Sequence, residues 1–241
     1  MTARPLSGAD VQLVIFDLMG TLISDDGIVK RAYAAALAQS GISPGDEQNS
    51  AAWQRITELR GRPTLVVLSD VLDDPIADEE ATWAFDDSIL DSIPTLKKIP
   101  GADAILDRLH GDGVLTAVTT SFTPEVRKAV LKHCAWTDTF AAELSAHGSL
   151  RGHPSPDLLL GAILSLRVDS VAQVAIVGDS ATDLEAGNRA GAGVIVGVRS
   201  GTAPDDSLEQ SPHTHLINSV ADLFDVLEDP HTGGARRSTD K

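Results

Sequence analysis

Short apolar runs separated by helix-like stretches dominate the pattern of this chain. The runs occupy residues 11–16, 114–118, 174–177 and 193–198, and each ends in a polar or glycine-rich turn. Apolar runs of this length, alternating with helical segments, are typical of buried parallel strands in βαβ units. The pattern therefore predicts an α/β fold built on a doubly wound, mostly parallel sheet.

Helical spacing of apolar residues marks the stretches that alternate with the strands. It occurs in residues 102–109, 124–132, 156–166 and 181–190. Thr123, Pro124 and Glu125 match an N-cap, a first-turn proline and a first-turn acid. Doubly wound sheets bind ligands beyond the carboxyl ends of their strands, so we expect Asp17, Thr120 and Asp179 to share one site.

The alternation is interrupted once, between residues 23 and 98. Helical spacing at 28–39, 47–60, 65–72 and 78–91 predicts four helices there, inserted over the sheet. Residues 23–27 and 93–101 are the expected hinges, and a fixed helical subdomain is the alternative. Trp53 and Trp83 fit either the core of this insertion or the wall of a cleft.

The domain organisation follows from these breaks in the pattern. We expect an α/β core formed by residues 1–22 and 99–228, and a helical insertion over residues 23–98. Residues 229–241 lack apolar periodicity and are expected to form a disordered tail.

Charge and composition narrow the classes of partner. The net charge of the 241 residues is −16, which argues against nucleic acid and against an anionic membrane surface. A small anionic metabolite remains compatible, because a bound cation can reverse the field inside one cleft. No apolar run reaches the ~18 residues that span a bilayer, and residues 1–10 lack the order of a signal peptide. Cys134 is the single cysteine, so no intrachain disulfide can form and a reducing cytoplasm is the expected location. A monomer or homodimer is the expected state.

Three motifs follow the predicted strands in order. They are Asp17-Leu18-Met19-Gly20-Thr21, Thr120-Ser121 and Gly178-Asp179-Ser180-Ala181-Thr182-Asp183. In order and spacing they resemble the haloacid dehalogenase superfamily of hydrolases, over residues 11 to about 227. The resemblance implies a Rossmann-like core, and the insertion matches the superfamily's helical C1-type cap. Residues 24–29 and 197–201 look most like its phosphonatase-like branch.

The resemblance implies Mg²⁺-dependent hydrolysis through an aspartyl-phosphate formed on Asp17. The carboxylates of Asp17 and Asp179, with the backbone carbonyl of Met19, would supply the oxygen ligands that Mg²⁺ prefers. Asp183, one helical turn after Asp179, would orient the waters of the metal. The alternative for Asp179 and Asp183 is a pair that caps the next helix.

Other residues would contact the substrate. The Thr120 side chain and the Ser121 backbone amide can donate hydrogen bonds to phosphoryl oxygens. The resemblance adds Gly20, Arg62 and Thr64 as substrate-binding residues, although Arg62 is equally compatible with a solvated surface arginine.

Three positions depart from the superfamily pattern. Met19 stands where most of its phosphatases carry a second Asp, the general acid and base. Positioned proton transfer of that kind contributes ~10²–10⁴-fold, so hydrolysis of an unactivated alkyl phosphate should be slow. Thr64 stands at the position of the Schiff-base lysine of phosphonatases. His153 stands at the position of a Lys or Arg, and we hypothesise that it is protonated when an anionic ligand is bound.

Three functions are compatible with these residues. The first is a Mg²⁺-dependent hydrolase of a small phosphorylated or phosphonylated metabolite, whose leaving group needs no acid or whose missing Asp is replaced by another residue. The second is a catalytically impaired protein that binds metal and phosphate, which Met19 and His153 favour. The third is a haloacid dehalogenase, a reaction that needs no metal and leaves Asp179 and Asp183 unexplained.

Overall fold

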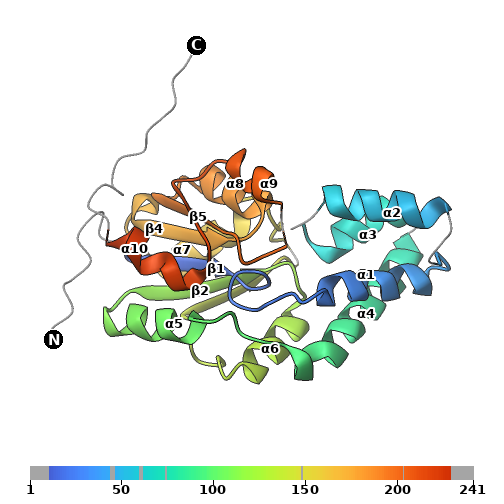
Figure 1. The fold of residues 1–241 in the computed structure, drawn as a ribbon, viewed down its shortest axis with the longest axis horizontal. Coiled ribbons are helices and arrows are strands. Elements are labelled where there is room, and N and C mark those ends of the chain that lie inside the picture. The colour runs from blue at the N-terminus through green and yellow to red at the C-terminus, as the bar shows by residue number, and fades with distance from the viewer. Residues whose placement is uncertain are drawn as a thin grey trace, which may run out of the picture.

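A six-stranded sheet forms the centre of the computed structural model, which describes residues 11–228 except 44–46, 60–61, 74, 148 and 203. The sheet order is β3-β2-β1-β4-β5-β6, and every neighbouring pair is parallel. The central strands β2, β1, β4 and β5 are labelled in Figure 1. The strands are β1 (Leu13–Asp17), β2 (Leu115–Thr120), β3 (Ala142–Ser145), β4 (Val174–Gly178), β5 (Val194–Val198) and β6 (His215–Ile217). The strand order reverses between β1 and β4, and such a switch point leaves a crevice beyond the strand ends.

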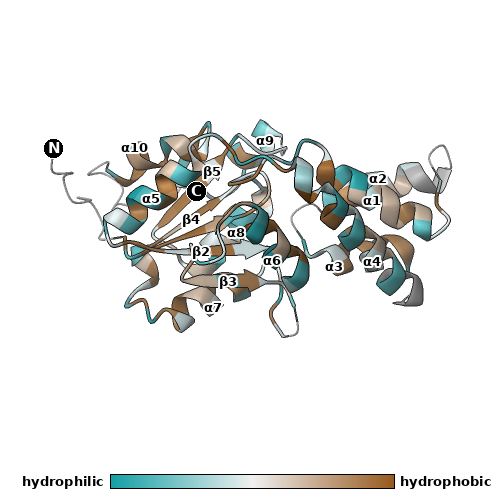
Figure 2. Cartoon of the chain, turned by 90° about the horizontal axis from the view of Figure 1, so that it is seen from below, coloured by the Kyte–Doolittle hydropathy of each residue, from teal (hydrophilic) through white to brown (hydrophobic). Residues whose placement is uncertain are grey.

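Alternate side chains of β1 supply two apolar cores. Val14 and Phe16 belong to a cluster with α5 and α10, whereas Leu13 and Ile15 pack with α7 and α8. Figure 2 shows helices on both sides of the sheet accordingly. The helices that follow the insertion are α5 (Ala102–Gly111), α6 (Pro124–His133), α7 (Asp157–Ser165), α8 (Ala181–Ala190), α9 (Asp205–Glu209) and α10 (Leu223–Leu227), with short 3-10 turns η1 (Ile93–Thr95), η2 (Val171–Gln173) and η3 (Val220–Asp222).

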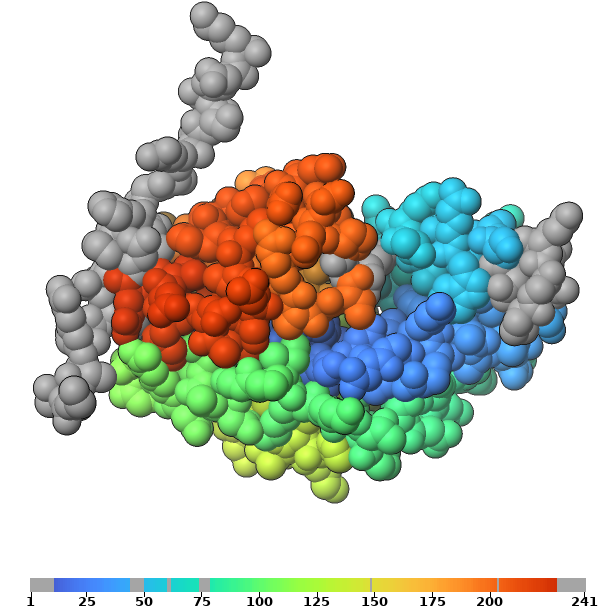
Figure 3. Space-filling model, in the orientation of Figure 1, coloured from blue at the N-terminus to red at the C-terminus, as the bar shows by residue number. Residues whose placement is uncertain are grey.

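The segment between β1 and α5 is helical. It contains α1 (Ile28–Gln39), α2 (Glu47–Glu58), α3 (Thr64–Leu72) and α4 (Pro75–Ser92), which lie together at one end of the molecule (Figure 3). Its two connections to the core lie side by side. The amide of Ser24 donates to the carbonyl of Lys97 at 2.9 Å, and the amide of Ile99 donates to the carbonyl of Leu22 at 2.9 Å.

The apolar core continues from the sheet into the insertion. The ring of Phe85 in α4 lies between those of Tyr33 in α1 and Phe122 of the core, with centroids 4.8 and 6.3 Å away. Beside them, the Thr123 hydroxyl donates to Asp86 at 2.8 Å. The insertion is therefore packed against the core around Phe122 as well as joined to it by two connections.

The predicted fold class is confirmed, since the sheet is parallel and covered by helices on both faces. The four predicted strands and eight predicted helices are all present, and the N-cap at Thr123 accepts from the amide of Val126. Strands β3 and β6 and helices α9 and α10 were not predicted. The predicted tail, residues 229–241, lies outside the described residues. None of the described helices combines the length and the apolar character needed to cross a membrane.

Candidate active site

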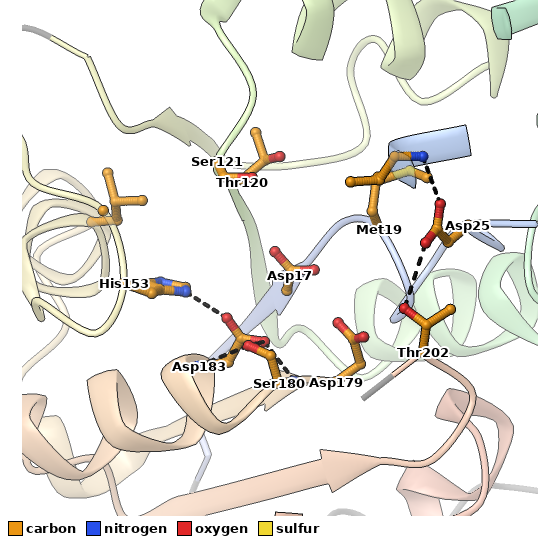
Figure 4. Close-up of a pocket in the computed structure, with 13 residues that line it drawn as sticks. Asp17, Met19, Asp25, Thr120, Ser121, His153, Asp179, Ser180, Asp183 and Thr202 are labelled. Atoms are coloured by element: carbon orange, nitrogen blue, oxygen red, sulfur yellow. Dashed lines mark hydrogen bonds and ion pairs between the residues drawn. The ribbon is translucent and has the colours of Figure 1, made fainter. Parts of the chain in front are cut away.

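The polar side chains at the strand ends line one cavity. Asp17 is the last residue of β1 and Thr120 the last of β2, while Asp179 directly follows β4. A cavity of about 80 Å³ opens between them and reaches Ser121 and the buried His153 (Figure 4). The expectation that Asp17, Thr120 and Asp179 lie together is confirmed.

Three carboxylates meet in this cavity. One oxygen each of Asp17, Asp179 and Asp183 lies within 4.8 Å of the others. Asp179 and Asp183 are buried, with exposed fractions of 6% and 3%. Such a group of oxygens fits a hard divalent cation, which would offset the mutual repulsion of the carboxylates.

The pKa of the Asp17 carboxyl also favours a cation at this site. The cavity leaves this side chain partly exposed, but the protein atoms around the carboxyl desolvate it. Burial, followed by the charges of Asp183 and Asp179, raises the pKa of Asp17 well above its usual range. An ionised Asp17 is therefore costly in the protein without a cation.

Asp183 caps α8 and also belongs to the acid cluster. Its Oδ2 accepts from the amide and hydroxyl of Ser180, at 2.9 and 2.7 Å, and the Ser180 hydroxyl accepts from the amide of Asp183. This reciprocal pair is a capping box. The capping alternative thus holds for Asp183 without excluding a role near a metal, because the same contacts fix the carboxyl beside Asp17.

Two glycines let the chain approach the Asp179 carboxyl. Gly20 has a φ of +91°, a backbone conformation that favours glycine. A Cβ on Gly20, or one on Gly201, would overlap the side chain of Asp179. Gly20 is therefore placed against Asp179, and its expected contact with substrate stays a prediction. The close approach of Gly201 was not predicted.

The end of β2 carries hydrogen-bond donors. The Thr120 hydroxyl accepts from the amide of Phe122 at 3.2 Å, which leaves its own proton available to the cavity. Ser121 lines the cavity beside it. Both positions are compatible with contacts to an oxyanion.

His153 makes a contact that was not anticipated. Its Nδ1 is 2.6 Å from Oδ1 of Asp183. In this bond Nδ1 is the donor whenever Asp183 is a carboxylate, because a carboxylate only accepts. The other nitrogen, Nε2, is buried and has no hydrogen-bond partner among the described residues. The nearby Arg151 does not take the place of the Lys or Arg that the superfamily pattern has at position 153. Its side chain is exposed and paired with Asp157.

The opposite side of the cavity contains Met19, Asp25 and Thr202 (Figure 4). Asp25 accepts from the amide of Val29 at 2.8 Å, and the Thr202 hydroxyl lies 3.5 Å from its other oxygen. Asp25 and Thr202 were not predicted as site residues. Asp25 belongs to segment 24–29, which carries part of the family resemblance, and that resemblance could have identified Asp25 as a site residue.

Arg62 and Thr64 do not line the cavity. Thr64 is buried at the start of α3, and Arg62 is exposed. Pro63, between them, contacts the site indirectly, because its ring lies against Gly152 in the loop that carries His153. Substrate contacts of Arg62 and Thr64 stay predictions.

Replacing Asp17 by Asn should stabilise the metal-free protein. A raised pKa in the folded state means that ionisation of Asp17 opposes folding, fully at pH values above that pKa and not at all below about 4, where both states are protonated. In EDTA, we expect Asp17→Asn to melt higher than the parent at pH 8, by about 2–4 °C for each kcal/mol gained. The difference should shrink as the pH falls. Equal melting temperatures at pH 8 would contradict this electrostatic account of the site.

Comparisons with known proteins agree with the fold and the site. The chain is 29% identical over 218 residues to a probable phosphatase, IndB, of Dickeya dadantii, covering 88% of this chain and 91% of that one. It is 25% identical over 269 residues to a phosphonoacetaldehyde hydrolase of Bordetella pertussis, covering 96% and 97%. A crystal structure of a hydrolase from Pseudomonas syringae has the same fold, with a TM-score of 0.79 at 21% identity over 90% of this chain and 98% of that one. The family model for haloacid dehalogenase-like hydrolases matches residues 11–191. The chain therefore belongs to the haloacid dehalogenase-like hydrolase family.

Proposed function

We propose that this protein is a Mg²⁺-dependent phosphatase- or phosphonatase-like hydrolase of a small phosphorylated or phosphonylated metabolite. The observation that carries the proposal is the cluster of Asp17, Asp179 and Asp183 at the switch point of the sheet. The helical segment 23–98 would be a C1-type cap that covers the site, as in the phosphonatase-like branch. Small anions in the cytoplasm, rather than nucleic acids or membranes, are the proposed partners of a monomer or homodimer.

Asp17 is the proposed nucleophile. One of its oxygens attacks phosphorus, and the bond from phosphorus to the leaving group breaks with the electron pair going to that group. Water then attacks the phosphorus of the aspartyl-phosphate, which releases phosphate and regenerates Asp17. The Thr120 hydroxyl and the Ser121 amide would hold the phosphoryl oxygens, where negative charge accumulates.

Asp17 and Asp179, with the Met19 carbonyl, would hold Mg²⁺, and Asp183 would orient its waters. When bound, Mg²⁺ neutralises charge between the carboxylates and the phosphoryl group. The raised pKa of Asp17 supports this assignment, because burial and then the charges of Asp183 and Asp179 make its ionised form costly unless a cation is present.

Met19 restricts the leaving group. Its thioether neither donates nor accepts a proton in catalysis, so departure of an alkoxide would be unassisted. The carboxylate of an acyl phosphate or the phosphate of an anhydride can depart without protonation by an acid. Acyl phosphates and anhydrides are therefore the preferred substrates. Thr64 cannot form a Schiff base, so phosphonoacetaldehyde is not the proposed substrate. This holds although one relative is named a phosphonoacetaldehyde hydrolase.

The test is hydrolysis of acetyl phosphate and para-nitrophenyl phosphate by the purified protein. We expect phosphate release with Mg²⁺, none with EDTA, and recovery when Mg²⁺ is returned in excess. Phosphate release that persists unchanged in EDTA would contradict the proposed metal site.

A binding protein is the second candidate, favoured by Met19 and by the His153–Asp183 contact. It predicts that Mg²⁺ and phosphate bind with no Asp17-dependent turnover on a broad panel of phosphoesters and phosphonates. Metal-independent release of halide from a 2-haloacid would instead support a dehalogenase.

A further inference from the structure

A second, larger cavity adjoins the catalytic one. It measures about 440 Å³ and lies along α1 and α2 of the insertion. It shares Asp25, Val29 and Thr202 with the catalytic cavity. The two spaces therefore meet on the side of Asp17 that faces away from His153 (Figure 4). Cavities of about 300–1,000 Å³ are the size that organic ligands occupy.

The walls of this second cavity are aromatic and aliphatic. Tyr33 and Ile56 are buried, and the indole of Trp53 is half-buried. A half-buried indole face next to aliphatic side chains suits a flat apolar group, which gains both area burial and ring stacking. Of the two positions expected for Trp53, it occupies the wall of a cavity. Trp83 does not line this cavity, and its side chain is 60% exposed.

Among the described residues that line this cavity, Lys30 is the one with a cationic side chain. The ammonium of Lys30 lies 5.7 Å from the centroid of the Trp53 ring. Among the described residues no carboxylate forms an ion pair with Lys30. In a protein of net charge −16, an uncompensated lysine beside an aromatic wall is suited to an acidic group on a ligand.

We propose that this second cavity, defined by Lys30, Tyr33, Trp53 and Ile56, binds the organic part of the substrate. The substrate class is then a phosphate or phosphonate whose organic part is a ring or other flat apolar group, with an acidic substituent that reaches Lys30. This inference rests on the proposed function. The phosphoryl group occupies the cavity at Asp17, and the organic part passes Asp25 and Thr202 into the second cavity.

Two pairs of ligands test the inference without changing the reacting bond. Benzoyl phosphate and acetyl phosphate differ in the ring but not in the type of leaving group. Benzylphosphonate and methylphosphonate are the counterparts for calorimetric titration with Mg²⁺, and they are not expected to be cleaved because their carbanions are poor leaving groups. We expect benzoyl phosphate to have the higher kcat/KM, by about tenfold or more, and benzylphosphonate to bind correspondingly tighter.

Substitutions then locate the preference. Trp53→Ala should remove the advantage of the aromatic ligand in both assays, and Trp53→Leu should retain part of it. Trp83→Ala, on the exposed surface of α4, is the matched control and should retain all of it. Lys30→Gln should weaken 4-(phosphonomethyl)benzoate about two- to fivefold relative to benzylphosphonate, as expected of an exposed ion pair.

The outcomes separate this inference from the proposed function. If the aromatic and small ligands are hydrolysed and bound alike, and Trp53→Ala changes neither, the second cavity is not the substrate pocket, but the hydrolase assignment stands. If methylphosphonate shows no Mg²⁺-dependent binding and neither acyl phosphate is turned over, both proposals are overturned.

Discussion

Asp17→Asn is expected to abolish hydrolysis of acetyl phosphate, with a loss on the order of 10⁴-fold or more, as when a nucleophile is removed from another hydrolase. The amide nitrogen and oxygen of Asn are poor nucleophiles, and the substitution also removes one of the proposed metal ligands. Because Asn has nearly the same shape as Asp, the loss of activity would come from the missing carboxylate and not from altered packing. Initial rates of phosphate release at saturating Mg²⁺ measure it.

Asp107→Asn is the matched control for that experiment. Asp107 is an exposed carboxylate on α5 and does not line the cavity. Its replacement should leave the rate unchanged. A folded Asp17→Asn protein with near-parental turnover would show that another group attacks phosphorus.

Met19→Asp is expected to accelerate hydrolysis of an unactivated alkyl phosphate such as ethyl phosphate by ~10²–10⁴-fold. The new carboxyl would stand on the side of the cavity that contains Asp25 and Thr202, where the proposed leaving group departs. It would protonate the departing alkoxide and then accept a proton from the attacking water. Acetyl phosphate, which needs no acid, should gain much less from the substitution.

Met19→Leu keeps the size of the side chain without a carboxyl and should not accelerate either substrate. If Met19→Asp folds and still shows no gain on ethyl phosphate, proton transfer at this position does not limit the rate. The limit would then lie with His153 or with the helical insertion.

The central strands could be predicted from sequence because both of their faces are buried. β1 and β4 are continuous apolar runs, since each packs against helices on both sides. β3 and β6 were missed for the complementary reason. They lie at the two edges of the sheet, are short, and contain polar residues such as Glu143 and His215. Edge strands of this kind carry too weak a period to separate them from loops.

The chemistry of the site could be predicted only in part. The positions of Asp17, Thr120 and Asp179 follow from strand ends, which the apolar pattern marks. The contact between His153 and Asp183 depends on how two loops far apart in sequence fold back on each other, and no local pattern encodes it. The same holds for Gly201 against Asp179 and for the second cavity, whose lining joins residues of α1 and α2 to Thr202 from far along the chain.

The most direct test of the account is a crystal structure with Mg²⁺ and fluoroberyllate, a mimic of the phosphoryl group in an acyl phosphate. We predict beryllium bonded to a carboxylate oxygen of Asp17, and one Mg²⁺ shared by Asp17 and Asp179 with Asp183 beside it. A structure in which the mimic binds away from Asp17, or in which no cation joins the two loops, would contradict the central claim that Asp17 attacks phosphorus with the help of a metal.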